Sequence, residues 1–117
     1  MELVALLTQG KGSWGQVTGV IKKGRWDKIL IIGDETAKRF NVDKNFEFIQ
    51  IDTGKEIKYL KEEIFKKVKG KIKGMEVALS IASGDGKEHM ALISALLSLP
   101  VGVRFSVLTK EGLLNLN

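Results

Sequence analysis

The sequence predicts an α/β protein with a doubly wound parallel sheet of five strands in the order 3-2-1-4-5, a Rossmann-like three-layer sandwich. Two observations lead to this fold class. Apolar runs rich in Val, Ile and Leu alternate with helical periodicity along the chain, and right-handed crossovers between such units give this strand order. The run Ile29–Ile32 is apolar throughout, which is typical of a strand buried on both faces of a parallel sheet. A length of 117 residues predicts a single domain, residues 1–117.

Strands and helices are expected to alternate strictly. The predicted strands are Leu3–Thr8, Lys28–Ile32, Phe46–Ile51, Glu76–Ala82 and Val101–Leu108. The predicted helices run from Ser13 to Gly24, from Glu35 to Phe40, from Lys55 to Val68, and from just after Asp85 to about Leu99. Residues 109–117 are expected to form a tail that is too short for a further domain.

Two of these helices begin with a capping-box pattern. Ser13 is followed three residues later by Gln16, and Asp85 is followed by Glu88 in the same way. In a capping box the first side chain accepts the backbone N–H of the third helical residue, whose own side chain returns a hydrogen bond. Both helices are therefore predicted to begin with this reciprocal pair.

Composition restricts the chemistry of the protein. There is no cysteine and one histidine, His89, which excludes disulfides, thiol nucleophiles, thiolate metal sites and multi-histidine metal sites within one chain. We predict no metal and no cofactor. No apolar run approaches the ~20 residues of a membrane span and no signal-like segment opens the chain, so a cytoplasmic location is expected. High Lys, Glu and Ile content is typical of a heat-stable protein.

The net charge of +5 permits an anionic partner without selecting one. The densest lysine group lies in residues 66–73 and contains few aromatic residues. A nucleic-acid reader would more often show arginines aimed at bases or stacking aromatic rings. We interpret this group as a solvated helix face.

Two glycine-rich turns each follow a predicted strand and open a predicted helix, and they hold most of the candidate ligand-binding residues. In the first turn these are Gly10, Gly12, Ser13 and Trp14, and in the second Ser83, Gly84, Gly86 and Lys87. The strands before them are neighbours at the switch point of the predicted order, so both turns are expected to face one crevice. Such a turn before a helix N-terminus can bind an anion. The alternative is an ordinary tight turn whose glycines supply positive φ angles.

The first turn has the pattern Gly10-x-Gly12-x-x-Gly15, which resembles the dinucleotide-binding fingerprint of Rossmann dehydrogenases. Asp34 stands just beyond the second predicted strand, where that family has its ribose-binding acid. This resemblance implies a small protein that binds an NAD(P)-type dinucleotide.

The second turn gives a different resemblance. The segment from Ala78 to Leu92, with Ser83-Gly84-Asp85-Gly86-Lys87 at its centre, resembles the CRISPR-associated Rossmann fold (CARF) family. The hallmark of that family is Thr/Ser-Gly-Gly-Thr-Lys followed by Met-Ala and a hydrophobic helix, and Met90-Ala91 stand at the matching place. Residues 26–36 also resemble the second strand of the family and its turn, whereas Asp85-Gly86 replace the family's Gly-Thr pair.

The CARF resemblance implies a homodimeric sensor of cyclic oligoadenylate, with the ligand across the crevice between two subunits. Lys87 would supply a cation, Ser13 or Ser83 a hydroxyl donor, and the glycines close approach of the backbone to phosphate. Trp14 would stack on a base or, alternatively, cover the first helix. The resemblance assigns no catalytic residues, and a protein-interaction domain with an unused crevice remains a third alternative.

The helix after Asp85 is apolar or small around nearly its whole circumference. Ala91, Ser94, Ala95 and Ser98 form a stripe of small side chains, and leucine, isoleucine and methionine fill most other positions. This leaves too little polar surface for a helix with one side in water. A helix enclosed by the core is the alternative, but a homodimer through Met90–Leu99 is the better explanation in a chain of this size.

Overall fold

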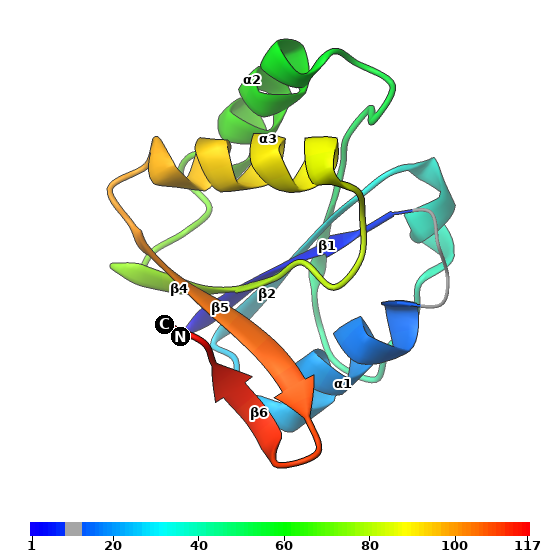
Figure 1. Cartoon of the computed structure of the whole chain (residues 1–117), viewed down its shortest axis with the longest axis vertical. Coiled ribbons are helices and arrows are strands. Elements are labelled where there is room, and N and C mark those ends of the chain that lie inside the picture. The colour runs from blue at the N-terminus through cyan, green and yellow to red at the C-terminus, as the bar shows by residue number, and fades with distance from the viewer. Residues whose placement is uncertain (9–12) are drawn as a thin grey trace.

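The computed structural model of the chain describes residues 1–8 and 13–117. Its strands form one sheet in the order β3-β2-β1-β4-β5-β6 (Figure 1). The strands are β1 (Glu2–Leu7), β2 (Lys28–Gly33), β3 (Glu47–Gln50), β4 (Glu76–Ser80), β5 (Gly102–Thr109) and β6 (Gly112–Asn115). The helices are α1 (Trp14–Lys23), the 3-10 helix η2 (Glu35–Arg39), α2 (Ile57–Val68) and α3 (Gly86–Leu97). The α/β class and the run 3-2-1-4-5 agree with the prediction.

The predicted number of strands is wrong, because a sixth strand follows the expected five. β6 pairs antiparallel with β5, with Val107 opposite Leu114. The two strands are joined by a tight turn in which Gly112 has a φ of 107° and the Thr109 hydroxyl donates to the Gly112 carbonyl at 3.0 Å. Residues 109–117 therefore complete the sheet as a hairpin instead of forming a tail.

Helices cover both faces of the sheet. α2 and α3 lie on one face, and α1 lies on the other (Figure 1). Side chains of β1 alternate between the two cores, with Val4 and Leu6 in the core under α2 and α3 and Leu3 in the core under α1. The continuous apolar strands predicted from the sequence are thus buried on both sides. In the described part of the chain, no helix has the length and apolar character needed to cross a membrane.

The two predicted capping boxes have different outcomes. At α3 the Asp85 carboxylate accepts the Glu88 N–H at 2.8 Å and the Glu88 carboxylate accepts the Asp85 N–H at 3.2 Å, which confirms the prediction. At α1 the prediction is wrong, because Ser13 makes no side-chain capping bond. The Gln16 amide instead donates to the Leu108 carbonyl at 3.2 Å and accepts the Leu108 N–H at 2.9 Å. Gln16 therefore joins α1 to β5.

Candidate functional site

The candidate site lies at the carboxyl edge of the sheet, where β1 and β4 are neighbours. Ala5 of β1 is in register with Ser80 of β4. The chain leaves β1 toward α1 on one face and leaves β4 toward α3 on the opposite face. Connections that depart in opposite directions leave room for a ligand between them, so this is the switch point of the fold.

A buried hydrogen-bond network joins the ends of the two strands. The Thr8 N–H donates to the Ser83 hydroxyl oxygen at 3.1 Å, and the Thr8 hydroxyl donates to the Glu88 carboxylate at 2.8 Å. All three residues are buried. Because Glu88 also accepts the Asp85 N–H, a single carboxylate connects β1, the turn after β4 and the first turn of α3. The network fixes the two sides of the crevice relative to each other.

Gly84 occupies a position in this turn that only glycine can take without strain. Its φ is 100°, and an added Cβ would lie 2.5 Å from Leu6 Cδ2 and 2.9 Å from the Glu88 carboxylate. The His89 ring nitrogen Nε2 donates to the Ser83 carbonyl at 2.8 Å and closes the turn from the other side. The expectation that Gly86 also needs a positive φ is wrong, because Gly86 is the first residue of α3 and a Cβ there would meet nothing within 4 Å.

The N-terminus of α3 already holds a carboxylate of the chain itself. Asp85 accepts the Glu88 N–H and so occupies part of the end of the helix dipole that attracts anions. Lys87 extends away from this point, because its ammonium donates to the carbonyls of Thr53 at 2.8 Å and Lys55 at 2.9 Å. The lysine thereby fixes the loop before α2 against α3.

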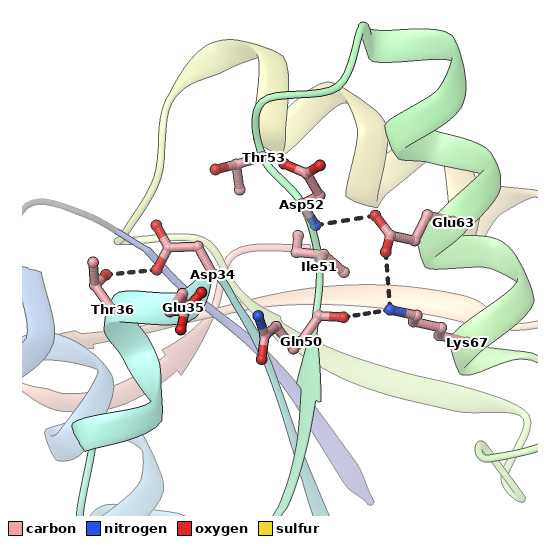
Figure 2. A pocket seen from close by; sticks show the side chains of 9 residues that line it. All are labelled: Asp34, Glu35, Thr36, Gln50, Ile51, Asp52, Thr53, Glu63 and Lys67. Atoms are coloured by element: carbon pink, nitrogen blue, oxygen red, sulfur yellow. Dashed lines mark hydrogen bonds and ion pairs between the residues drawn. The ribbon is translucent and has the colours of Figure 1, made fainter.

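Two adjoining hollows form the crevice. The larger, of about 710 Å³, lies between the ends of β2 and β3 and α2, and the smaller, of about 320 Å³, lies at the start of α3. Asp34 and Thr53 line both. Figure 2 shows Asp34 and Thr36 on one side of the larger hollow and Glu63 and Lys67 of α2 on the other. The remaining lining residues of the larger hollow are Glu35, Gln50, Ile51 and Asp52, and those of the smaller are Thr8, Gly84, Asp85 and Glu88.

Hydrogen bonds hold the acidic side chains of the larger hollow in place. The Thr36 hydroxyl donates to Asp34 at 2.6 Å. Glu63 accepts the Asp52 N–H at 3.0 Å and the Lys67 ammonium at 2.9 Å (Figure 2). Burial raises the pKa of Glu63, but the hydrogen bonds from Lys67 and Asp52 and the nearby lysine charges outweigh it and lower the pKa below 4.5. Glu63 is thus ionised at neutral pH.

The crevice is acidic although the whole chain is basic. Its lining contains six carboxylates and one lysine, Lys67, which is paired with Glu63. A phosphate placed here would lie beside carboxylates, whereas hydroxyl and amino groups of a ligand would find hydrogen-bond acceptors. No group of three or more His, Asp or Glu is arranged to hold a metal ion within residues 1–8 and 13–117.

The structure brings part of the predicted site together. Asp34 and Gly84 line the crevice, and Gly86 and Lys87 lie in the first turn of α3. Ser83 is buried in the Thr8 network. Gly10 and Gly12 lie outside the described residues, so the fingerprint of the first turn is not tested.

Trp14 is not among the residues that line the two hollows. Its indole N–H donates to the Thr8 carbonyl at 3.0 Å, and its ring meets Phe40 edge to face at 5.9 Å between centroids. Neighbouring Ser13 is the half-buried residue before α1. These contacts do not test the predicted ligand-binding roles of Trp14 and Ser13, which stay predictions.

Of the residues that line the crevice, only Asp34 and Gly84 were predicted from the sequence as site residues, and the missed ones include Thr8 and Glu88 of the buried network. Thr8 was read as the last residue of a strand, and Glu88 as a helix cap alone. Their direct hydrogen bond spans 80 positions, so a local pattern could not reveal it. A polar residue that ends an otherwise apolar run at the switch point was the available signal.

Comparison with known proteins does not assign the chain to a family. No protein-family model matches it, and no curated protein matches it.

Proposed function

We propose that this chain is a ligand-sensing, CARF-like module that binds a cyclic oligonucleotide at the carboxyl edge of the sheet, where two copies meet. The observation that carries the proposal is the junction of β1 and β4. The Thr8 N–H bonds to Ser83, so the turn after β4 and the end of β1 form one unit. A ligand that moved one side of the crevice would therefore move the other. The proposal places the protein in the cytoplasm, with such a messenger as its partner.

The acidic lining decides how such a ligand would be held. Asp34 and Thr53 lie where ribose hydroxyls or base amino groups can donate to oxygen. The phosphates would lie toward the backbone N–H groups of Gly86 and Lys87 at the start of α3. Lys87 would then exchange the carbonyls of Thr53 and Lys55 for a phosphate oxygen. This exchange would release the loop before α2, which gives the module a way to report binding.

Calorimetry at moderate salt tests the proposal. Cyclic tetra-adenylate, cyclic hexa-adenylate, linear tetra-adenylate and NAD would each be titrated into the parent chain. One cyclic molecule per two chains supports the proposal, since a two-fold symmetric crevice prefers a two-fold symmetric ligand. One NAD per chain would support the dinucleotide alternative instead. No heat with any of them contradicts both.

A matched pair of lysine variants locates the site. Lys87→Ala should weaken binding about tenfold, because it removes a charge-assisted contact to phosphate. Lys66→Ala on the exposed side of α2 makes the same change in charge and should leave the affinity unchanged. Equal effects of the two variants would indicate general charge attraction and not a site at α3.

A protein-interaction domain with an unused crevice is the second candidate, and the Asp85 cap favours it. Asp85 occupies the N-terminus of α3 that a phosphate would otherwise use. Asp85→Asn keeps a side chain that caps well and removes the negative charge. If the crevice binds a phosphate ligand, Asp85→Asn should tighten binding several-fold; if the crevice is unused, the variant should bind no better than the parent.

A further inference from the structure

Most lysines on and near α2 have no ion pair. Residues 55–73 contain eight lysines, and ion pairs engage three of them: Lys55 and Lys67 with Glu63, and Lys71 with Glu47. The lysines of this segment without an ion pair among the described residues are Lys58, Lys61, Lys66, Lys69 and Lys73. Like charges close together on one helix repel one another, so this excess of charge does not stabilise the fold. It points to a partner that carries negative charge.

The outer side of α2 carries four of these unpaired lysines. The opposite, apolar side of the helix is fully buried in the core. Residues three or four positions apart form one row along a helix, and residues seven positions apart lie above one another in the same way. We call two such rows the α2 lysine surface; they are Lys58, Lys61, Phe65 and Lys69 in the first, and Tyr59 and Lys66 in the second.

Two aromatic rings position three of these lysines. The ammonium groups of Lys61 and Lys69 lie 5.5 and 5.7 Å from the centroid of the Phe65 ring. The ammonium group of Lys58 lies 5.8 Å from the centroid of the Tyr59 ring. A cation–π contact orients an ammonium group, and unlike an ion pair it brings no opposite charge. The three lysines are therefore placed along the helix with their charge available to a partner.

The Tyr59 ring also borders a hollow on the outer side of α2. Tyr59 is 52% exposed, and the hollow has a volume of about 360 Å³. Its other lining residues are Lys55, Glu62, Glu63, Lys66 and Lys67. This volume is near the lower end of the ~300–1,000 Å³ of small-ligand pockets, which suits one nucleobase better than a large cofactor. An exposed ring among lysines is the arrangement on which the bases of a single strand stack.

A phosphate chain fits this surface better than other anionic partners. A helix that binds a lipid surface needs a free apolar side to enter the membrane, and that side of α2 is buried. Residues 55–73 contain no arginine, the side chain that most often reads base edges in a duplex, so the expected contacts are to phosphate. The lysine group in residues 66–73 has few aromatic residues of its own. The turns of α2 bring Tyr59 and Phe65 beside it, which the sequence pattern did not show.

We propose that the α2 lysine surface binds single-stranded nucleic acid without sequence preference. The lysines contact phosphates along the strand, and Tyr59 stacks on one base. From Lys58 to Lys69 the helix rises by about 16 Å, which suits the short end of the ~4–16 nucleotides that such sites cover. None of the six residues of the surface lines the crevice. The inference therefore does not rest on the proposed function.

Fluorescence anisotropy with a labelled oligouridylate of about 20 nucleotides tests the proposal. Uridylate lacks the adenine of the ligand proposed for the crevice. The logarithm of the association constant should fall linearly with the logarithm of the salt concentration, with a slope of about −3 for four lysine contacts. Combining Lys58→Ala, Lys61→Ala and Lys69→Ala should weaken binding at low salt at least about tenfold and bring the slope to about −1.

A second triple variant is the matched control. Combining Lys22→Ala, Lys23→Ala and Lys110→Ala removes the same charge at exposed positions outside the surface. This control should keep the affinity and the salt slope close to those of the parent. An equal loss in the two triple variants would mean attraction by the total charge and would overturn the proposal, as would a parent that does not bind.

Two single variants test the remaining parts of the surface. Tyr59→Leu should weaken binding at least about fivefold without changing the salt slope, because the ring stacks on a base and carries no charge. Glu62→Gln removes an acidic group beside Tyr59 and Lys66 and should tighten binding several-fold. A misfolded protein would not bind more tightly, so this gain is independent of any loss of structure. Unchanged affinity in both variants would contradict the placement of the strand on this side of α2.

The choice of partner and of site is tested separately. Tighter binding of a duplex of the same length would contradict a single-stranded partner. Binding to phosphatidylserine vesicles or to polyglutamate, without binding to oligouridylate, would overturn the assignment to nucleic acid. Cyclic tetra-adenylate titrated into the Lys58, Lys61 and Lys69 triple variant distinguishes this inference from the proposed function. Loss of oligouridylate binding with the cyclic ligand still bound supports both sites, whereas oligouridylate binding by a parent that ignores the cyclic ligand supports the α2 lysine surface alone.

Discussion

The carboxyl-edge crevice and the segment around α2 carry opposite charges. Residues 55–73 contain eight lysines and three glutamates, and their net charge of +5 equals that of the whole chain. The rest of the chain is neutral, and it supplies five of the six carboxylates that line the crevice; the sixth, Glu63, and the one lysine, Lys67, belong to α2. The sign of the total charge therefore gives no guide to the charge at the candidate site.

The two regions also differ in how the charged groups are held. In the crevice, Glu88 accepts from the Thr8 hydroxyl and Glu63 accepts from the Asp52 N–H. Lys61 of α2 and Lys69, which directly follows α2, lie over the Phe65 ring at 5.5 and 5.7 Å, and neither forms an ion pair with the described residues. Positioned carboxylates stabilise the fold, whereas lysines without an ion pair contribute little to it. Substitutions should therefore have large effects in the crevice and small ones on the exposed side of α2.

The largest effect is expected at Glu88. Glu88→Ala would leave the Thr8 hydroxyl and the Asp85 N–H without their partner in a buried network, at a cost of about 3 kcal/mol in the free energy of unfolding. Glu62→Ala on the exposed side of α2 is the control and should change it by less than about 0.5 kcal/mol. Urea unfolding measures both, and similar values for the two variants would remove the distinction between the regions.

A smaller effect is expected from the backbone of the crevice. Gly84→Ala should destabilise the fold by about 2 kcal/mol, because its φ of 100° and the contact with Leu6 both oppose a Cβ. Gly86→Ala adds the same methyl group two residues later in open space and should be neutral or slightly stabilising. Thermal unfolding of the pair gives the comparison, and an equal loss at both positions would contradict the turn geometry.

Lowering the pH should weaken the crevice through Glu63, the α2 carboxylate that lines it. The pKa of Glu63 is lowered in the folded state, so its contribution to stability is present above the unfolded value of 4.5 and is lost as the pH falls through the folded pKa. The pKa of Glu47 is lowered as well, chiefly by the hydrogen bond from Lys71, and acts in the same direction. Urea unfolding would be measured from neutral pH to pH below 4.5. As the pH falls, the free energy of unfolding should decline less for Glu63→Gln than for the parent. If the free energy of unfolding fell equally with pH in the two proteins, the stabilising role of ionised Glu63 would be contradicted.

The smallest effect is expected at the end of α2, at its C-cap residue Lys69. Lys69→Ala removes a cation–π contact at an exposed position and should change the free energy of unfolding by no more than about 0.5 kcal/mol. Added salt should change the stability of this variant and of the parent alike. A loss above about 1 kcal/mol would mean that the lysines of α2 are structural after all.

The architecture could be predicted well from the sequence because the patterns that indicate its strands and helices are local. The apolar run Ile29–Ile32 and the helical spacing of Leu60, Ile64 and Val68 need no knowledge of distant residues. β6 was missed because it is short and follows a two-residue connection, Lys110-Glu111, which reads as a polar end. β6 is stabilised by its pairing with β5, and the pattern of its own residues does not indicate a strand.

The candidate site was predicted less completely for the same physical reason. Gln16 matched a capping pattern, yet its amide meets Leu108, 92 residues away. The acidic character of the crevice arises from carboxylates on separate elements, among them Asp34, Glu63 and Asp85, which only the fold brings to one place. The glycine-rich turns indicated where the crevice lies, but not its charge.

The position of β1 has a consequence for the order of folding. β1 pairs with β2 on one side and with β4 on the other, and the bond from Thr8 to Ser83 spans 75 residues. Residues 2–33 hold β1, α1 and β2, which can associate early through nearby contacts. The other edge of β1 then stays open until residues 76–80 have been synthesised, and an unpaired apolar edge invites pairing with another chain. A nascent chain that stalls before β4 should therefore aggregate, while one released after it should close its sheet.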